Sequence, residues 1–517
     1  MPDSSEKINY PELFFGFVAP IGADLRPALT EFRTYLDTHS YKVIELKVTD
    51  IFNLLEHYIV PKKRLSKATE QARYDTYIAY GNQLRATFQD DILAATAIRR
   101  VMDKRLKLSP KGEFSNLAFL IHQFKRKEEI DLLRSIYGRL FFQVSIYSRR
   151  GARVDYLSRK FASSANRSAA KQYRHSAEAL IERDENEAEQ KHGQRVASIF
   201  HDADFIISLD ATETVESQVK RFCELIFGSN SISPTKSEYG LFLAKAAALR
   251  SLDLSRQVGA AIFSAAGEII ALGSNEVPKA KGGTYWSDDK FDDRDYVRRQ
   301  DSNDQRKKEI FGELARLIKP EADATRLLQN PKIRDSQFMD ALEYGRVVHA
   351  EMSAISDAAR CGHSVRDATL YSTTFPCHMC AKHIVAAGIC KVVFLEPYPK
   401  SLAFDLHADS IQVEGGDRGH YHEFPAAMFE HFYGVSPRRY REIFERGRRK
   451  DESGAFVDYR DGVPSPIFDI KFPFYAYLEE YFTKKAMRAV NAIKRKKRGR
   501  PALASGLARP SKPPRRS

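Results

Sequence analysis

The sequence His349-Ala350-Glu351, followed 24 residues later by Pro376-Cys377-His378-Met379-Cys380, decides the fold of the C-terminal half. One imidazole and two thiolates supply three zinc ligands and leave the fourth position of a tetrahedral ion open to water. Three protein ligands are typical of a catalytic zinc, whereas a structural zinc uses four. We therefore predict a Zn²⁺ cofactor held by His349, Cys377 and Cys380.

Glu351 lies two residues after His349, so its carboxylate projects near the metal without ligating it. A carboxylate in this position can accept a proton from an activated water molecule and return it to the substrate. A structural zinc site would have no use for such a residue. We predict that Glu351 is the catalytic acid and base.

The segments around this motif alternate between strands and helices. Apolar runs predict a pair of strands at 257–263 and 268–277 that form a hairpin, and further strands at 368–373 and 391–397. Helical spacing predicts helices at 239–249, 349–360 and 378–388. The last two begin at the motif, where a helix N-terminus favours thiolates. This half is therefore expected to be an α/β/α domain.

The N-terminal half has its own strand and helix rhythm. Short apolar runs predict strands at 13–18, 41–48, 116–122, 140–147 and 203–209, with helices at 25–36 and 128–137 between some of them. This order favours a parallel sheet covered by helices. The polar stretch 228–238 is the best domain boundary. We predict domains at 1–232 and 233–483, with a charged, exposed insertion at 278–345, and a tail at 484–517.

A glycine-containing loop, GFVAPIGAD (16–24), stands between the first strand and the first helix. A phosphate-binding loop would lie there, but Ala23 replaces its Lys and Asp24 its Ser/Thr. Gly16, Gly22 and Asp24 are therefore candidates for a degenerate nucleotide-binding loop. A purely structural strand–turn–helix remains the alternative. Without the Lys, we predict no kinase activity.

The charge of the chain is concentrated in its last segment. The chain carries 82 Lys and Arg and 68 Asp and Glu, a net charge of +14. Residues 481–517 hold 13 Lys and Arg and no acid, which leaves about +1 for the rest. The basic tail is expected to be disordered, and its Lys497–Pro501 resembles an AT-hook core. The tail therefore predicts a weak contact with DNA or RNA. The alternative is that it binds phosphate polymers without any preference.

Composition also indicates where the protein works. Apolar residues make up 43% of the chain, enough for ordinary cores, and no apolar run is long enough to cross a membrane. The start of the chain lacks the apolar core of a signal peptide, and five cysteines do not make a disulfide framework. We expect a cytoplasmic protein without a membrane partner.

The motif H-x-E…P-C-x-x-C resembles that of the cytidine and deoxycytidylate deaminase superfamily, and the resemblance covers about residues 238–410. It implies zinc binding by His349, Cys377 and Cys380, and proton transfer by Glu351. The stretch 251–278 resembles the first two strands of deoxycytidylate deaminases. In these the Asn that ends the second strand contacts the sugar, which implies a substrate-binding role for Asn275. An Asn in a turn is the structural alternative.

The order of the two halves resembles that of bacterial anti-phage deoxycytidine-nucleotide deaminases. The matching stretches are 124–150, RDENE (183–187) with Gly193-Gln194, EVPKAKGGTYW (276–286) and 396–411. The resemblance implies a P-loop-kinase-like regulatory domain with a parallel sheet and helices, followed by the deaminase-like domain. It also implies conversion of dCTP or dCMP to dUTP or dUMP and ammonia, depletion of dCTP during phage infection, and a homo-oligomer. A cytosine or adenine deaminase acting on single-stranded DNA or RNA is the alternative, since its chemistry is identical.

Overall fold

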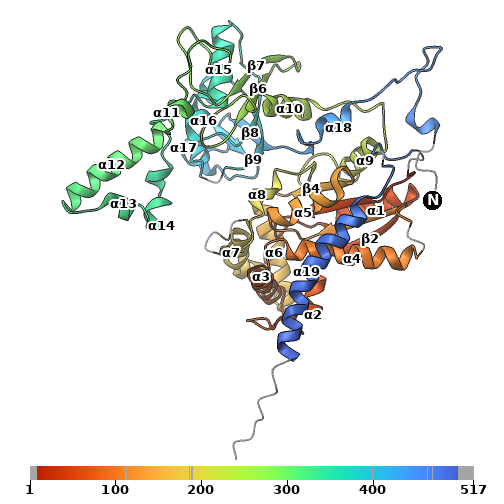
Figure 1. The fold of residues 1–517 in the computed structure, drawn as a ribbon. Coiled ribbons are helices and arrows are strands. Elements are labelled where there is room, and N and C mark those ends of the chain that lie inside the picture. Colours follow the sequence, from red (N-terminus) through yellow and green to blue (C-terminus); the bar gives the residue numbers. More distant parts are fainter. Residues whose placement is uncertain are drawn as a thin grey trace, which may run out of the picture.

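The computed structural model describes residues 8–498 except 111–112, 186, 188–189, 399, 463 and 469. It is a mixed α/β structure with two six-stranded sheets in two lobes, shown one above the other in Figure 1. The lower lobe holds the N-terminal sheet and the upper lobe holds the sheet that carries the zinc motif. In the part of the chain that the structure describes, no helix is both long enough and apolar enough to cross a bilayer.

The N-terminal sheet is parallel except at one edge. Its strand order is β12-β5-β4-β1-β3-β2, and only β12 runs antiparallel to its neighbour. Every residue of β1 and β3 is buried, as expected for strands covered by helices on both faces. The sheet thus confirms the predicted parallel α/β arrangement. Its parallel strands are β1 (Leu13–Val18), β2 (Lys42–Lys47), β3 (Leu117–His122), β4 (Phe141–Tyr147) and β5 (Phe205–Ser208).

Nine α-helices of this lobe lie within the described residues up to 232, and the sequence predicted α1 and α5 closely. The segment that contains α3 and α4 was not predicted, because the apolar residues of α3 do not form a single stripe. The bounds are α1 (Arg26–Thr38), α2 (Phe52–Leu55), α3 (Glu70–Thr87), α4 (Ile92–Leu108), α5 (Lys127–Tyr137), α6 (Arg150–Ser164), α7 (Arg174–Glu185), α8 (Ala197–Phe200) and α9 (Val215–Ile226).

The second sheet has the order β10-β11-β9-β8-β6-β7. The predicted hairpin is present as β6 (Gly259–Phe263) and β7 (Ile269–Ser274), and β6 also pairs antiparallel with β8. The other pairs are parallel. The remaining strands are β8 (Thr369–Thr374), β9 (Lys391–Glu396), β10 (Ile411–Val413) and β11 (Ala427–His431). The helices of this lobe are α10 (Lys236–Ala248), α15 (Ala350–Arg360), α16 (His378–Ala386), α17 (Ala403–His407) and α18 (Tyr440–Phe444).

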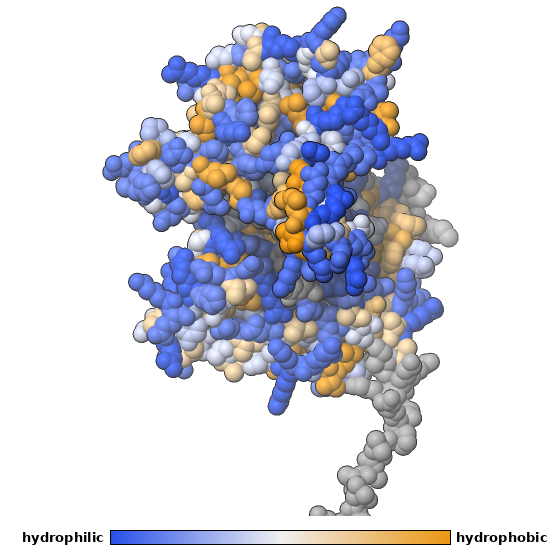
Figure 2. Space-filling view, turned by 90° about the vertical axis from the view of Figure 1, so that its left-hand side faces the viewer, coloured by the Kyte–Doolittle hydropathy of each residue, from blue (hydrophilic) through white to orange (hydrophobic). Residues whose placement is uncertain are grey.

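The segment 278–345 projects from the upper lobe as helices and loops, with α12 as its longest helix (Figure 1). An antiparallel bridge between Glu276 and Val348 joins its two ends. Figure 2 views the side from which it projects and shows small apolar patches on a largely hydrophilic surface. Its helices are α11 (Asp295–Arg298), α12 (Ser302–Ile318), α13 (Ala324–Leu327) and α14 (Pro331–Arg334).

The C-terminal boundary predicted at residue 483 is wrong. Residues 484–498 are not a disordered tail but the end of helix α19 (Tyr475–Arg498), which lies along α4 of the N-terminal lobe (Figure 1). Ala486 and Val490, one helical turn apart, are buried in the N-terminal core. β12 (Gly434–Val435) also returns to the first sheet, so the chain from there on does not belong to the second lobe alone. Residues 499–517 lie outside the described residues.

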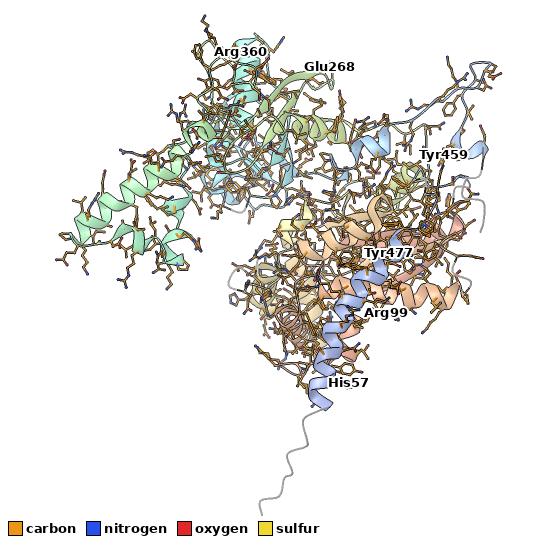
Figure 3. The ribbon with its side chains drawn as sticks, viewed as in Figure 1. His57, Arg99, Glu268, Arg360, Tyr459 and Tyr477 are labelled. Atoms are coloured by element: carbon orange, nitrogen blue, oxygen red, sulfur yellow. The ribbon has the colours of Figure 1, made fainter. Side chains whose placement is uncertain are left out.

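A buried ion network fixes α19 to the first lobe. Arg105 of α4 lies 2.7 Å from a carboxylate oxygen of Glu12 and 2.6 Å from one of Glu479. The hydroxyl of Tyr137 donates to Glu479 over 2.9 Å, and that of Tyr475 donates to Glu12 over 3.0 Å. One guanidinium therefore compensates two buried carboxylates. In Figure 3, Tyr477 and Arg99 mark α19 and α4.

Arg105→Met is expected to lower the free energy of unfolding by about 3–5 kcal/mol, because it leaves two buried carboxylates without a cation. Chemical denaturation measures this loss. Arg99→Met is the matched control on the same helix: its side chain is 51% exposed, so its ion pair with Asp103 contributes at most about 1 kcal/mol. Equal losses in the two variants would show that the network does not hold α19 in place.

Candidate active site

The zinc motif lies where two helices of the upper lobe begin. His349 is the N-cap of α15, and the bridge from Val348 to Glu276 holds it beside the end of β7. Cys377 is the N-cap of α16, three residues after the end of β8, and Cys380 lies in the first turn of that helix. Because β7 and β8 both flank β6, the sheet brings the two helix N-termini together.

The three predicted ligands converge on one point. Nδ1 of His349 lies 3.3 Å from Sγ of Cys377 and 3.4 Å from Sγ of Cys380, and the three ligand atoms lie within 4.8 Å of one another. A tetrahedral zinc ion with ordinary Zn–N and Zn–S bonds needs a separation of about 3.6 Å between nitrogen and sulfur. The donor set therefore fits zinc. Among the described residues, no other three His, Cys, Asp or Glu side chains meet in this way.

The two thiols of the site differ in their pKa values. A hydrogen bond from Cys380, together with His349, lowers the pKa of Cys377 to about 4. The same bond raises the pKa of Cys380, and burial adds to that shift. The hydrogen bond with Cys377 also raises the pKa of His349. A metal that binds here must therefore displace protons from Cys380 and His349.

Glu351 lies beside the ligands, as predicted. Its side chain is 4% exposed, and burial raises its pKa. The hydroxyl of Ser372 donates to Oε1 of Glu351 over 2.9 Å, and Sγ of Cys380 lies 3.3 Å from Oε2. The carboxylate is thus held at a fixed position next to the ligand atoms, where it can exchange a proton with a group bound there.

Ser372 is a site residue that the sequence analysis missed. It is fully buried in β8, on the same face of the strand as the core residue Leu370. A hydroxyl among apolar residues on the buried face of a strand needs a partner, and here the partner is Glu351. That break in the apolar pattern was the available signal.

A cavity of about 310 Å³ opens beside the ligands. Asn275, Thr374 and Phe375 line it, and so do Asp301 and Asn303 of the insertion. The sequence predicted the insertion to be exposed but did not predict that it borders the site. Polar residues in a charged loop look the same whether they line a cavity or face solvent.

Asn275 lines the cavity, but its amide also has a structural task. Its Oδ1 accepts a 2.7 Å hydrogen bond from the backbone N–H of Val258, and its Nδ2 donates to the carbonyl of Arg256 over 2.8 Å. It thus fixes the segment that carries the Arg256 guanidinium, which lies 3.1 Å from Glu396. A contact between Asn275 and a sugar stays a prediction.

Gly16, Gly22 and Asp24 lie in the other lobe, and the structure does not bring them to this site. A Cβ on Gly16 would meet the ring of Phe141 at 2.5 Å, so packing requires this glycine. Gly22 has a φ of +92° in a tight turn, where glycine is favoured. Asp24 is paired with Arg26 at 2.6 Å. These contacts explain the residues structurally, and their role in nucleotide binding stays a prediction.

Residues 234–396 match the family described as "Cytidine and deoxycytidylate deaminase zinc-binding region". Deoxycytidylate deaminase of Enterobacteria phage T2 is 50% identical over 54 residues, which are 10% of this chain and 29% of that protein. A probable deoxycytidylate deaminase of Drosophila melanogaster is 31% identical over 160 residues, 31% of this chain and 58% of that one. The chain therefore spans less than two thirds of the curated relatives it matches.

Among solved structures, the dCMP deaminase of the cyanophage S-TIM5 in its apo form covers 38% of this chain and 99% of its own, with 16% identity and a TM-score of 0.22. The family match covers all three zinc ligands, Glu351 and Ser372. The predicted zinc cofactor is thereby confirmed. Residues 234–396 are thus similar to the zinc-binding region of cytidine and deoxycytidylate deaminases and hold a His/Cys/Cys set that fits zinc.

Proposed function

We propose that this chain is a hydrolase that removes the C4 amino group of deoxycytidine nucleotides, converting dCMP or dCTP to dUMP or dUTP and ammonia. The observation that carries the proposal is the buried Glu351 carboxylate beside three converging zinc ligands at a cavity. The relatives named deoxycytidylate deaminases support this substrate class, over the part of their length that is matched.

The residues of the site have separate tasks in this reaction. Zinc held by His349, Cys377 and Cys380 supplies a Lewis acid that lowers the pKa of water. Glu351 accepts one proton from the attacking water and delivers it to N3 of cytosine, then takes the second proton from the new C4 hydroxyl and delivers it to the amine. The bond between C4 and the amine nitrogen breaks, a C4–O bond forms, and ammonia leaves. Ser372 holds Oε1 of Glu351, so that Oε2 carries the proton.

Ser372→Ala is expected to lower kcat by about 10–100-fold, because a hydrogen bond to a charged group contributes about 1.5–3 kcal/mol. Zinc content should stay at the wild-type level, since Ser372 donates to Glu351 and to no zinc ligand. Steady-state kinetics and metal analysis check both points. Ser372→Thr, which keeps the hydroxyl, should retain more activity. An unchanged kcat in Ser372→Ala would contradict the positioning role.

A free nucleotide is the better substrate proposal than a polynucleotide. A binding track for single strands needs positive charge along the folded body, and here the surplus charge lies in residues 481–517. The cavity is small, and the insertion encloses one side of it. Deamination of cytosine or adenine in single-stranded DNA or RNA is the second candidate, since the zinc motif is shared by both classes.

The cellular role that we propose is depletion of dCTP during phage infection, based on the resemblance of the two-domain order to anti-phage deaminases. Expression of the chain in phage-infected cells should lower the dCTP pool and raise uracil deoxynucleotides, as measured by mass spectrometry of cell extracts. The Glu351→Gln variant is the control and should leave the pools unchanged. Unaltered pools with the wild-type chain would overturn the proposed function.

We also propose that the N-terminal lobe is a P-loop-kinase-like domain that regulates the deaminase and does not phosphorylate. The glycine loop follows the central strand β1, but Ala23 stands where a catalytic Lys would be needed. None of the five cysteines, all of which the structure describes, forms a disulfide bond, which supports the proposal that the protein works in the reducing cytoplasm.

The proposed homo-oligomer has support in the insertion, where Leu317 and Ile318 of α12 are 81% and 86% exposed. Sedimentation of the full chain, compared with a Leu317→Asp variant, tests this association. A wild-type chain that sediments as a monomer would contradict it.

We propose that the basic tail 484–517 contacts nucleic acid. Removing its last part, residues 499–517, is expected to weaken binding to a DNA duplex at low salt and to leave turnover intact, because α19 is kept. Removing 481–517 should instead destabilise the protein, since that cut removes the buried Ala486 and Val490. Filter binding and thermal unfolding distinguish the two truncations. Unchanged DNA binding after the shorter cut would contradict the contact.

A further inference from the structure

Two adjoining cavities lie at the carboxyl ends of β1, β2 and β3 in the N-terminal lobe. Their volumes are about 330 and 280 Å³, and both are lined by Lys47, Thr49, Arg73, Tyr77 and Lys160. Lys47 ends β2, while the other side chains come from the following turn and from α3 and α6. In open parallel sheets this is the edge at which ligands bind.

The first cavity holds more cations than anions. Lys47, Lys67, Arg73 and Lys160 all line it, and Glu70 is the carboxylate that faces them, 2.8 Å from Arg73 and 3.4 Å from Lys160. The other lining carboxylate, Asp50, is paired with Arg100 at 3.3 Å. Glu70 balances one of the four lining cations, so three positive charges are left without a counterion among the described residues, a surplus that suits an anionic ligand.

Lys47 is the cation most in need of a partner. No ion pair with Lys47 is present in the described part of the chain. Burial lowers its pKa, and the nearby Arg73 and Lys160 lower it further while Asp50 and Glu70 oppose them. An anion placed between Lys47, Arg73 and Lys160 would relieve this repulsion.

The second cavity is aromatic and apolar in character. Tyr74, Tyr77 and Tyr156 line it, together with Ile21, Leu25 and Leu93. Gln123, at the end of β3, also lines it and is held at a φ of +79°, a strained backbone conformation for a residue other than glycine. Its side chain accepts a 2.8 Å hydrogen bond from Thr49. A cationic end joined to an aromatic end fits a ligand that has a phosphate and a ring.

The glycine loop itself has no room for a phosphate. The carboxylate of Asp184 accepts the backbone N–H of Ile21 over 2.6 Å and lies 2.8 Å from the amine of Lys125. That amine also donates to the carbonyl of Ala19 over 2.9 Å. The Asp184 carboxylate thus already accepts the Ile21 amide that a phosphate would need. The Lys125 amine beside the loop is already paired as well.

We propose that the N-terminal lobe binds a nucleoside phosphate in these two cavities, with the phosphates between Lys47, Arg73 and Lys160 and the base beside Tyr77 and Tyr156. The site lies next to the glycine loop and does not use its amides. It is separate from the zinc site in the other lobe and does not depend on the deaminase activity.

Equilibrium dialysis of the full-length, zinc-loaded chain tests this site. The probes are radiolabelled dATP, dGTP and dTTP, which are not cytosine nucleotides, and inorganic tripolyphosphate. At least one nucleotide should bind, and the Lys47→Gln/Lys160→Gln double variant should weaken that binding by about tenfold or more. Lys107→Gln, an exposed lysine of α4, is the matched control and should bind as the wild type does. Because the double variant removes like-charge repulsion, its thermal stability should be preserved.

Three results would overturn the proposal. The first is that none of the three nucleotides binds. The second is binding that survives in the double variant but falls in Arg256→Gln, which would place the probe in the zinc-site cavity. The third is tripolyphosphate binding as tightly as the nucleotide, which would remove the role of the nucleoside. If the double variant is unstable, Lys160→Gln alone, with a side chain 34% exposed, should still weaken binding severalfold.

Discussion

Glu351→Gln is expected to lower the turnover of deoxycytidine nucleotides by about 10⁴-fold, at the upper end of what one acid–base residue contributes, because Glu351 serves several proton transfers. The amide has the shape of the carboxylate and can still accept the Ser372 hydroxyl, so the site should stay folded. It cannot take up the proton of the attacking water. Kinetics measured beside zinc content separate this chemical loss from loss of the metal.

The matched control is Glu268→Gln, an exposed carboxylate at the β6–β7 hairpin, away from the zinc motif (Figure 3). It should show wild-type turnover and wild-type zinc content. Substantial activity in Glu351→Gln with zinc bound would remove Glu351 from the mechanism.

Gly273→Ala is expected to disrupt the zinc site by forcing helix α15 away from strand β7. A Cβ at this position would lie 2.1 Å from the carbonyl oxygen of Ala350 and 2.6 Å from the backbone nitrogen of Ala354. A single backbone group of a helix cannot shift without the rest of the helix. α15 as a whole must therefore move, and His349 and Glu351 move with it. We expect zinc affinity to fall by about tenfold or more and stability to fall by about 1–3 kcal/mol.

Metal competition with a chromophoric chelator and chemical denaturation measure these two losses. Gly447→Ala is the control, because a Cβ there meets no atom within 4 Å. Zinc affinity and turnover of Gly273→Ala at the wild-type level would mean that α15 does not need this close approach to β7.

Much of the architecture was predictable because it rests on local patterns. The buried strands β1 and β3 are almost entirely apolar runs, and the His349 and Cys377 motifs combine fixed ligand spacing with helix starts. Both signals come from a few neighbouring residues. They therefore survive without knowledge of the tertiary structure.

The parts that escaped prediction depend on distant contacts. Charges dominate the C-terminal part of α19, and its attachment depends on Glu479 meeting Arg105, which is 374 positions away. The carboxylate of Asp184 accepts the backbone N–H of Ile21 in the glycine loop, although the two residues are 163 positions apart. The insertion residues Asp301 and Asn303 reach the cavity only because the bridge at Glu276 folds the insertion back. None of these partners leaves a local signal.

The most direct test of the proposed function is deamination of dCMP, dCTP and a cytosine-containing single-stranded oligonucleotide, measured side by side with the zinc-loaded chain. Uracil products and ammonia are quantified at equal cytosine concentration. We predict that dCMP or dCTP is converted to its uracil nucleotide with one ammonia per turnover, and that the oligonucleotide is left intact. Conversion of the oligonucleotide while both free nucleotides remain unchanged would contradict the account.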